Sequence, residues 1–212
     1  MKFNFLILTL AIIGFTSCQK ENLAKKDSQN LIQQSHITPC QTTNLQLKAI
    51  DEFIFSFNEV SKAMFESSES LSAATIQSKL QLLENQNDYS EFESLFVTEF
   101  SIPTDKLQDL YDKRLNLALH LDVDTNEESK ILFQNRFDQL IANDCIDISY
   151  YELIDFDGVS ARQTCLQVAI MGIGGAALIT AGGAATANPF AVAYGFLSLG
   201  NAIYTMASGG CN

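Results

Sequence analysis

The sequence is poor in the residues that most often carry catalysis and nucleic-acid binding. It contains no tryptophan and only two histidines, His36 and His120, so histidine-based acid–base chemistry has little to draw on. Its 13 basic residues are outnumbered by 25 acidic ones, and the net charge is −12. Nucleic acids and anionic lipid surfaces both require clustered Lys and Arg. We therefore expect no nucleic-acid partner, and we interpret the acidic balance as a device for solubility.

A second absence is local. The last fifty residues, 163–212, contain no Asp, Glu, Lys, Arg or His, yet they hold nine of the eleven glycines and eleven alanines. The residues before them are acidic and rich in Phe and Leu. A chain of 212 residues suits one domain, or one domain with an appendage. The charge-free segment is the chemically unusual part of the chain.

Common catalytic and cofactor motifs are also missing. The chain has no phosphate-binding loop, no His-Glu-x-x-His, no Gly-x-Ser-x-Gly and no Cys-x-x-Cys. The acidic loop at 122–126 lacks the glycine that a calcium loop requires next. Gly172, Gly174 and Ala177 match a dinucleotide-binding pattern, but no acidic residue follows to bind a ribose. We predict no metal, no cofactor and no enzymatic activity.

The N-terminus predicts export. Lys2 is followed by an apolar run at 5–15 that is too short to span a bilayer, as in a signal peptide covering 1–17. The run ends in Phe-Thr-Ser-Cys, which resembles the lipobox of bacterial lipoproteins, with Phe15 in place of the usual Leu. The resemblance implies that Cys18 is acylated and becomes the first residue of the mature chain. The alternative is a plain secretory signal followed by a chance cysteine.

The segment after the predicted anchor is polar. Gln-Lys-Glu-Asn at 19–22 is similar to a short tag that sends lipoproteins to the cell surface in one group of Gram-negative bacteria. This resemblance implies an outer-membrane, surface-exposed location, while a random polar start to a linker is an equal alternative. The whole of 18–44 is rich in Gln, Asn, Ser and Lys and too polar to form a core. We interpret it as a flexible tether.

Residues 45–159 predict an acidic helical domain. Their apolar residues recur at spacings of three and four, which is typical of amphipathic helices. The fifth helix is expected to begin at a capping box formed by Thr125 and Glu128. Ten phenylalanines between Phe53 and Phe156 would supply much of a core, although they could instead line a ligand groove. The fold class is therefore all-α. The five expected stripes run through residues 50–64, 76–83, 89–100, 107–121 and 125–141.

Four cysteines remain besides Cys18. They are Cys40, Cys145, Cys165 and Cys211. An even number in an oxidising compartment indicates two disulfides among three possible pairings. A zinc site is the alternative, although the spacings match no standard zinc module.

The pairing can be inferred from the one strong break in the charge-free segment, Asn188-Pro189. Cys165 lies 23 residues before Asn188, and Cys211 lies 22 residues after Pro189. If the chain folds back at this turn, the two thiols meet at the open end of a hairpin spanning 160–212. The two remaining cysteines would then pin the tether to the domain. The rival pairing, Cys145–Cys165, would strap the hairpin onto the domain instead.

Small residues predict close helix packing in the hairpin. Gly172, Ala176, Thr180 and Ala184 form a row with a period of four. Such a row allows two helices to approach closely, as in membrane helix pairs. Each glycine lowers helix propensity by about 1 kcal/mol in water. The helix therefore requires dense packing or a bilayer to persist.

Three interpretations of 163–212 remain open. The hairpin could be the buried centre of the domain, insert into a membrane, or be a membrane-active peptide shielded by the acidic domain. Its composition resembles the charge-free, Cys-closed segments of some bacteriocins and the apolar hairpins of pore-forming toxins. We expect a non-enzymatic lipoprotein of the cell envelope with a membrane-associated or interaction role and an unidentified protein partner. The alternative is an effector that inserts residues 163–212 into a target bilayer.

Overall fold

The computed structural model describes residues 39–121, 126–154, 159–185 and 189–211, which all belong to one compact unit, residues 36–212. The described residues form seven α-helices, one 3-10 helix and no strand, which confirms the all-α class. The elements are α2 Leu45–Ser68, α3 Ala73–Glu84, α4 Tyr89–Glu99, α5 Thr104–His120, α6 Glu127–Ala142, η1 Ser149–Leu153, α7 Val159–Ala185 and α8 Pro189–Ala207.

The five amphipathic helices predicted from periodicity are α2 to α6. Side-chain caps begin several of them, since Asn44 and Asp88 accept hydrogen bonds from the first backbone N–H groups of α2 and α4. The cap of α6 is Asn126 rather than Thr125. The Asn126 side chain accepts from the N–H groups of Glu128 and Ser129, which have no partner inside the helix. Thr125 itself lies outside the described residues.

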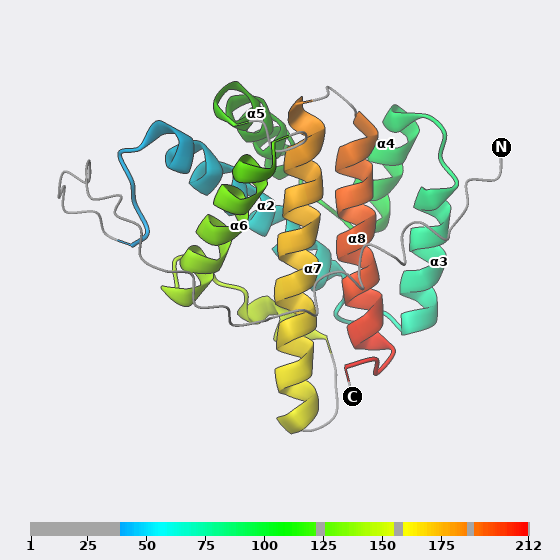
Figure 1. Cartoon of the computed structure of the whole chain (residues 1–212). Helices are drawn as coiled ribbons and strands as arrows, with labels where there is room; N and C mark the ends of the chain where they lie inside the picture. The colour runs from blue at the N-terminus through cyan, green and yellow to red at the C-terminus, as the bar shows by residue number, and fades with distance from the viewer. Residues whose placement is uncertain (1–38, 122–125, 155–158, 186–188, 212) are drawn as a thin grey trace. The chain divides into compact units, whose positions relative to one another are not determined.

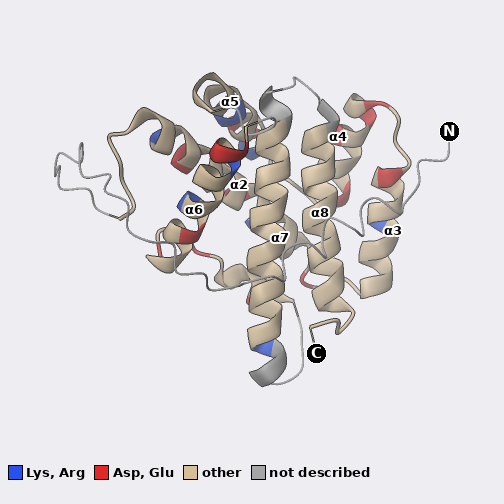
Figure 2. Cartoon of the chain, viewed as in Figure 1, with Lys and Arg blue, Asp and Glu red and all other residues tan. Residues whose placement is uncertain are grey.

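The hairpin formed by α7 and α8 makes one layer of the helical unit. The two helices lie side by side in front of α2, with α3 and α4 beside α8 and with α5 and α6 beside α7 (Figure 1). Charged residues are spread over the surrounding helices, whereas α8 carries none and α7 carries only Arg162 near its start (Figure 2). The acidic segment and the charge-free segment therefore share one packed unit.

Phenylalanines join the two layers. Phe196 of α8 stacks on Phe96 of α4 with ring centroids 4.2 Å apart and on Phe57 of α2 at 6.3 Å. All three rings are buried. Most of the predicted Phe stripe is likewise buried, so it serves as core. The buried members of that stripe are Phe53, Phe57, Phe65, Phe92, Phe96, Phe100, Phe133 and Phe137.

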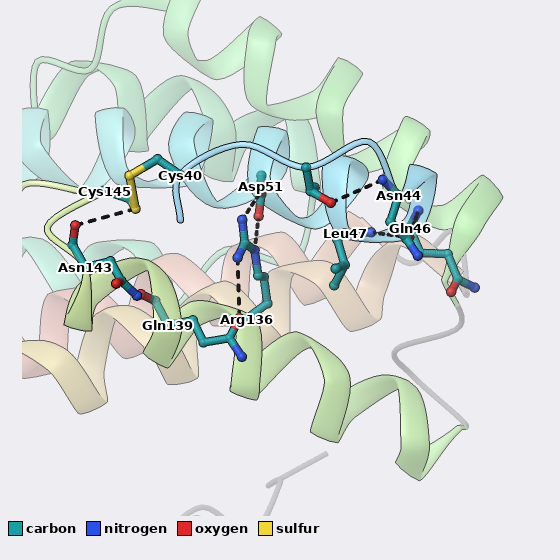
Figure 3. A network of polar contacts seen from close by, with 10 residues as sticks. Cys40, Asn44, Gln46, Leu47, Asp51, Arg136, Gln139, Asn143 and Cys145 are labelled. Atoms are coloured by element: carbon teal, nitrogen blue, oxygen red, sulfur yellow. Dashed lines mark hydrogen bonds and ion pairs between the residues drawn. A yellow bond between two sulfur atoms is a disulfide. The ribbon is translucent and has the colours of Figure 1, made fainter. Parts of the chain in front are cut away.

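A buried ion pair ties α2 to α6. The Arg136 guanidinium donates from Nε to Asp51 Oδ1 at 2.6 Å and from Nη2 to Asp51 Oδ2 at 2.7 Å (Figure 3). Gln139 Oε1 accepts a third bond from Arg136 at 3.4 Å. Both charged residues are buried, and a bidentate pair of this kind compensates each group for its lost water. Removing one partner alone would leave a buried charge, at a cost of about 3–5 kcal/mol.

Close to this ion pair, a disulfide fastens the segment before α2. Cys40 is bonded to Cys145, which follows α6, with the two Cα atoms 5.2 Å apart (Figure 3). The bond closes a loop of 105 residues. The C-terminal end of the predicted tether is thus fixed to the helical unit, as the sequence analysis predicted.

Candidate functional site

The charge-free hairpin is closed at its open end by the second disulfide. Cys165, near the start of α7, is bonded to Cys211, which follows α8, and both residues are buried. This is the pairing predicted from the spacing around Pro189, and the rival pairing Cys145–Cys165 is wrong. With all four cysteines paired, the zinc alternative is also wrong. Pro189 is the first residue of α8, where its missing N–H costs least, and Asn188 lies outside the described residues.

The predicted row of small residues packs against α8. A Cβ placed on Gly172 would overlap the Cβ of Ala202. The Thr180 hydroxyl donates to the Ala176 carbonyl at 2.8 Å, and a Cβ on Gly195 would overlap that hydroxyl and lie 2.9 Å from the Ala176 oxygen. The backbones of α7 and α8 therefore approach more closely than larger side chains would allow.

The sequence pattern predicted only the α7 side of this contact. The side chain of Ala184, the fourth member of the row, lies outside the described residues. The partners on α8, Gly195 and Ala202, were missed. They lie seven residues apart and thus on the same helix face, so a search of α8 for small residues at helical spacing would have found them.

The opposite side of the hairpin is exposed. Met171, Tyr194 and Ile179 are 61%, 57% and 42% exposed, respectively. The hairpin is therefore half-buried, which differs from a centre wrapped on all sides, because the surrounding helices cover only one of its faces (Figure 1). We call the exposed side the neutral face. It comprises the exposed residues Met171 and Ile179 of α7 and Tyr194 and Asn201 of α8, together with the half-buried residues Thr164, Val168, Gly175 and Leu178 of α7 and Ser198 and Thr205 of α8.

The neutral face differs from the other exposed apolar side chains. Leu115 and Leu119, neighbours on one face of α5, are also exposed, but the exposed Asp112 lies on the same face, three residues before Leu115. The neutral face instead draws on two adjacent helices and contains no ionisable group other than tyrosine. Exposed apolar surface of this kind marks sites of contact with proteins or membranes.

Helix α7 is also long enough to cross a bilayer. Among the described residues one stretch has the required length and composition, Arg162–Gly182, and 50% of its apolar window is buried. A buried core helix can have the same length and composition. Gly172, Gly174 and Ala177 all lie within this helix rather than in a turn before one, unlike a dinucleotide-binding loop.

A polar cluster between α4 and α5 is the other unusual arrangement. The hydroxyls of Tyr89 and Tyr111 are hydrogen-bonded to each other. Burial raises the pKa of both tyrosines. The Arg114 guanidinium lies 5.8 Å from the centre of the Tyr111 ring, and its buried Nε and Nη1 have no hydrogen-bond partner. Arg114 takes part in none of the ion pairs of the described residues, and we assign this cluster no chemistry.

Other places on the described surface offer less. A shallow, open depression along α4 is lined by Gln86, Ser90, Glu91, Ser94 and Leu95. Residues 39–121, 126–154, 159–185 and 189–211 contain no group of three His, Cys, Asp or Glu side chains that could hold a metal ion. Cys18, the predicted site of acylation, lies outside these residues.

Comparison with known proteins adds no assignment. No family model, no curated protein and no solved structure matches the chain. The neutral face, the packing of the hairpin and the N-terminal sequence are therefore the features on which a function can be proposed.

Proposed function

We propose that this chain is a non-enzymatic lipoprotein of the cell envelope that presents its neutral face to a membrane or protein partner. The observation that carries the proposal is a charge-free, partly apolar face on a protein whose net charge is −12. Each of the helices α2 to α6 carries Lys, Asp or Glu (Figure 2). The hairpin exposes Met171, Ile179 and Tyr194 with no charged residue on the same face, and this choice disfavours solubility unless the face is used for contact.

The proposed anchor is compatible with this use. Residues 1–18 carry the charge, apolar run and cysteine of a lipoprotein signal. The tether between Cys18 and Cys40 would reach about 70 Å when fully extended. The Cys40–Cys145 disulfide fixes the far end of this tether to the helical unit. Such a tether allows the neutral face to turn toward the membrane or toward a neighbouring protein.

The anchor is tested by fractionating cells that express the full-length chain or its Cys18→Ala variant. The expected result is that the unchanged chain remains in the membrane fraction after a salt wash, whereas Cys18→Ala moves to the soluble fraction. Ser17→Ala is the matched control, because it keeps a small residue beside an intact cysteine. Equal retention of the Cys18→Ala variant and the unchanged chain would overturn the lipoprotein assignment.

A second candidate is an effector that inserts its hairpin into a target bilayer. It is favoured by the length and composition of Arg162–Gly182. Insertion of both arms would withdraw Phe196 from its contacts with Phe57 and Phe96 and expose the core of the acidic helices. Adding the unacylated full-length chain to dye-loaded neutral vesicles, with and without reductant, tests this candidate. Dye release would favour the effector, and its absence under both conditions would exclude it.

A further inference from the structure

We infer that the neutral face binds a second copy of this chain, hairpin against hairpin. The inference rests on the proposed function in one respect, because it takes the neutral face as the contact surface. It adds the identity of the partner, which is a second copy of the chain.

The first observation is a glycine that the packing of this chain does not explain. Side chains at Gly172, Gly174, Gly195 and Gly200 would collide with Ala202, Phe137, Thr180 and Leu80, respectively. Gly175 is different, because a Cβ placed there would meet nothing within 4 Å. A glycine inside a helix, at a position with room for a Cβ, lowers the stability of the helix relative to alanine. What the missing side chain provides is room for another backbone to come close.

The second observation is the spacing of the neutral face along both helices. Positions separated alternately by four and three residues stay on one side of a helix and can interlock with a partner helix. On α7 the positions with this spacing are Thr164, Val168, Met171, Gly175 and Leu178, and on α8 they are Tyr194, Ser198, Asn201 and Thr205. The surface thus has the pattern required to receive helices, with Gly175 near its middle.

The third observation is polarity, which separates a protein partner from a bilayer. Ser198, Asn201 and Thr205 occupy the α8 side of the neutral face. The Thr205 hydroxyl already donates to the Asn201 carbonyl at 2.8 Å, but hydrocarbon offers the Asn201 side-chain amide no hydrogen bonds, so burial of that amide in a bilayer would be costly. A facing helix can accept and donate those bonds. A helical protein surface is therefore the better occupant.

Charge then favours a second copy. Two chains that each carry −12 repel one another wherever their acidic helices meet. On the neutral face two copies can touch without bringing like charges together or burying an ionised group, because its residues carry no charge. A two-fold arrangement needs only one patch that is complementary to itself. An uncharged surface that mixes apolar residues with Ser, Asn and Thr meets that requirement.

The size of the face sets the expected strength. The stretch from Thr164 to Leu178 is about 20 Å long, and two helices side by side are roughly 20 Å wide, which gives about 400 Å² per copy. Stable interfaces bury about 800 Å² per partner. The dimer should therefore be weak in solution and favoured when two chains are tethered in one membrane.

Thiol cross-linking of the full-length chain in the cell fraction that contains it is the direct experiment. A Met171→Cys variant, exposed to a mild oxidant, should form a covalent dimer on a non-reducing gel. A Leu82→Cys variant, whose position on α3 is similarly exposed but off the neutral face, should form about tenfold less. Equal dimer from both variants, or none from Met171→Cys, would overturn the inference. Cell fractionation tests the lipid anchor independently of the dimer. Failure of the proposed anchor can therefore be distinguished from failure of the proposed dimer.

Co-purification of two differently tagged full-length copies gives an independent readout. The Met171→Glu variant should reduce recovery of the second copy about tenfold, because an unpaired carboxylate would be buried at the interface. Ile131→Glu, at a similarly exposed position on α6, is the control and should leave recovery unchanged. The inference fails if Met171→Glu has no effect. A second result would also contradict it. If the unchanged copies never co-purify and Met171→Glu abolishes flotation with neutral vesicles, a bilayer is the occupant of the neutral face.

Discussion

The acidic helices α2 to α6 and the charge-free hairpin α7–α8 reach the same fold by different means. In the acidic helices, the buried apolar side chains follow one stripe and mostly polar or charged side chains cover the rest, so each sequence determines which face is buried. In the hairpin, small residues bring two backbones together, and the exposed side carries uncharged residues. The first region depends on local periodicity, whereas the second depends on contacts between segments distant in sequence.

The largest expected effect on the free energy of unfolding comes from removing the disulfides, because each of the two regions is closed by one. Replacing Cys165 and Cys211 by Ser should lower the free energy of unfolding by about 4 kcal/mol, from the entropy of opening a loop of 46 residues. For Cys40 and Cys145, with 105 residues, the loss should be about 5 kcal/mol. Urea unfolding of the two double variants measures both. Unchanged stability in either variant would show that its disulfide does not constrain the chain.

The next effect tests whether the two regions share one core. Phe196→Ala should destabilise the protein by about 3–5 kcal/mol, because the ring is buried between Phe57 and Phe96. Tyr194→Ala, two residues earlier on the exposed side of α8, should change stability by less than about 0.5 kcal/mol. The measurement is the urea midpoint of each variant. Similar losses from both substitutions would contradict the half-buried hairpin.

A pair of glycines sharpens the comparison within the hairpin itself. Gly195→Ala should lower the unfolding free energy by about 1–3 kcal/mol, since its Cβ would collide with Thr180 and crowd the Ala176 carbonyl. Gly175→Ala, in open space, should raise it by up to about 1 kcal/mol through helix propensity. Thermal unfolding of dilute protein, where the chain is a monomer, separates the two. Effects of the same sign would contradict the close packing of α7 on α8.

The sequence predicted the acidic helices α2 to α6 more completely than the surroundings of the hairpin. Periodicity placed α2 to α6, because a stripe on a helix determines the buried face before any partner is known. The Asn188-Pro189 break and the cysteine spacing predicted the hairpin and its disulfide. The exposed side of α7 was not predictable, because this helix is apolar in every direction. Long-range contacts were not predictable either, such as Asp51 with Arg136, 85 residues apart, or Phe196 with Phe96.

The smallest expected effect is a loss of stability at alkaline pH, and it arises from two tyrosines outside the hairpin. Burial raises the pKa of Tyr150, whose hydroxyl donates to Asn58 Oδ1 at 2.7 Å, and burial also raises the pKa of Tyr111. In the unfolded chain tyrosine ionises near pH 10. Since both pKa values are higher in the folded state, their contribution to stability is complete below about pH 10 and is lost as the pH rises further.

Urea midpoints measured on either side of about pH 10 test this dependence. The unchanged protein should lose stability on the alkaline side, and Tyr150→Phe should lose less, although it starts lower by about 1 kcal/mol without its hydrogen bond. An identical alkaline slope in the two proteins would show that Tyr150 ionises equally easily in both states.

The central claim is that the hairpin buries one face in the acidic helices and exposes the other. Three native methionines test it directly, since Met171 is 61% exposed on the neutral face, whereas Met206 of α8 and Met64 of α2 are fully buried. Peroxide oxidation of dilute native protein, followed by mass spectrometry of peptides, gives the three rates. We predict rapid conversion of Met171 to its sulfoxide, with Met64 and Met206 protected until the protein unfolds. Oxidation of Met206 as fast as Met171, or protection of Met171 in dilute monomer, would contradict the half-buried hairpin.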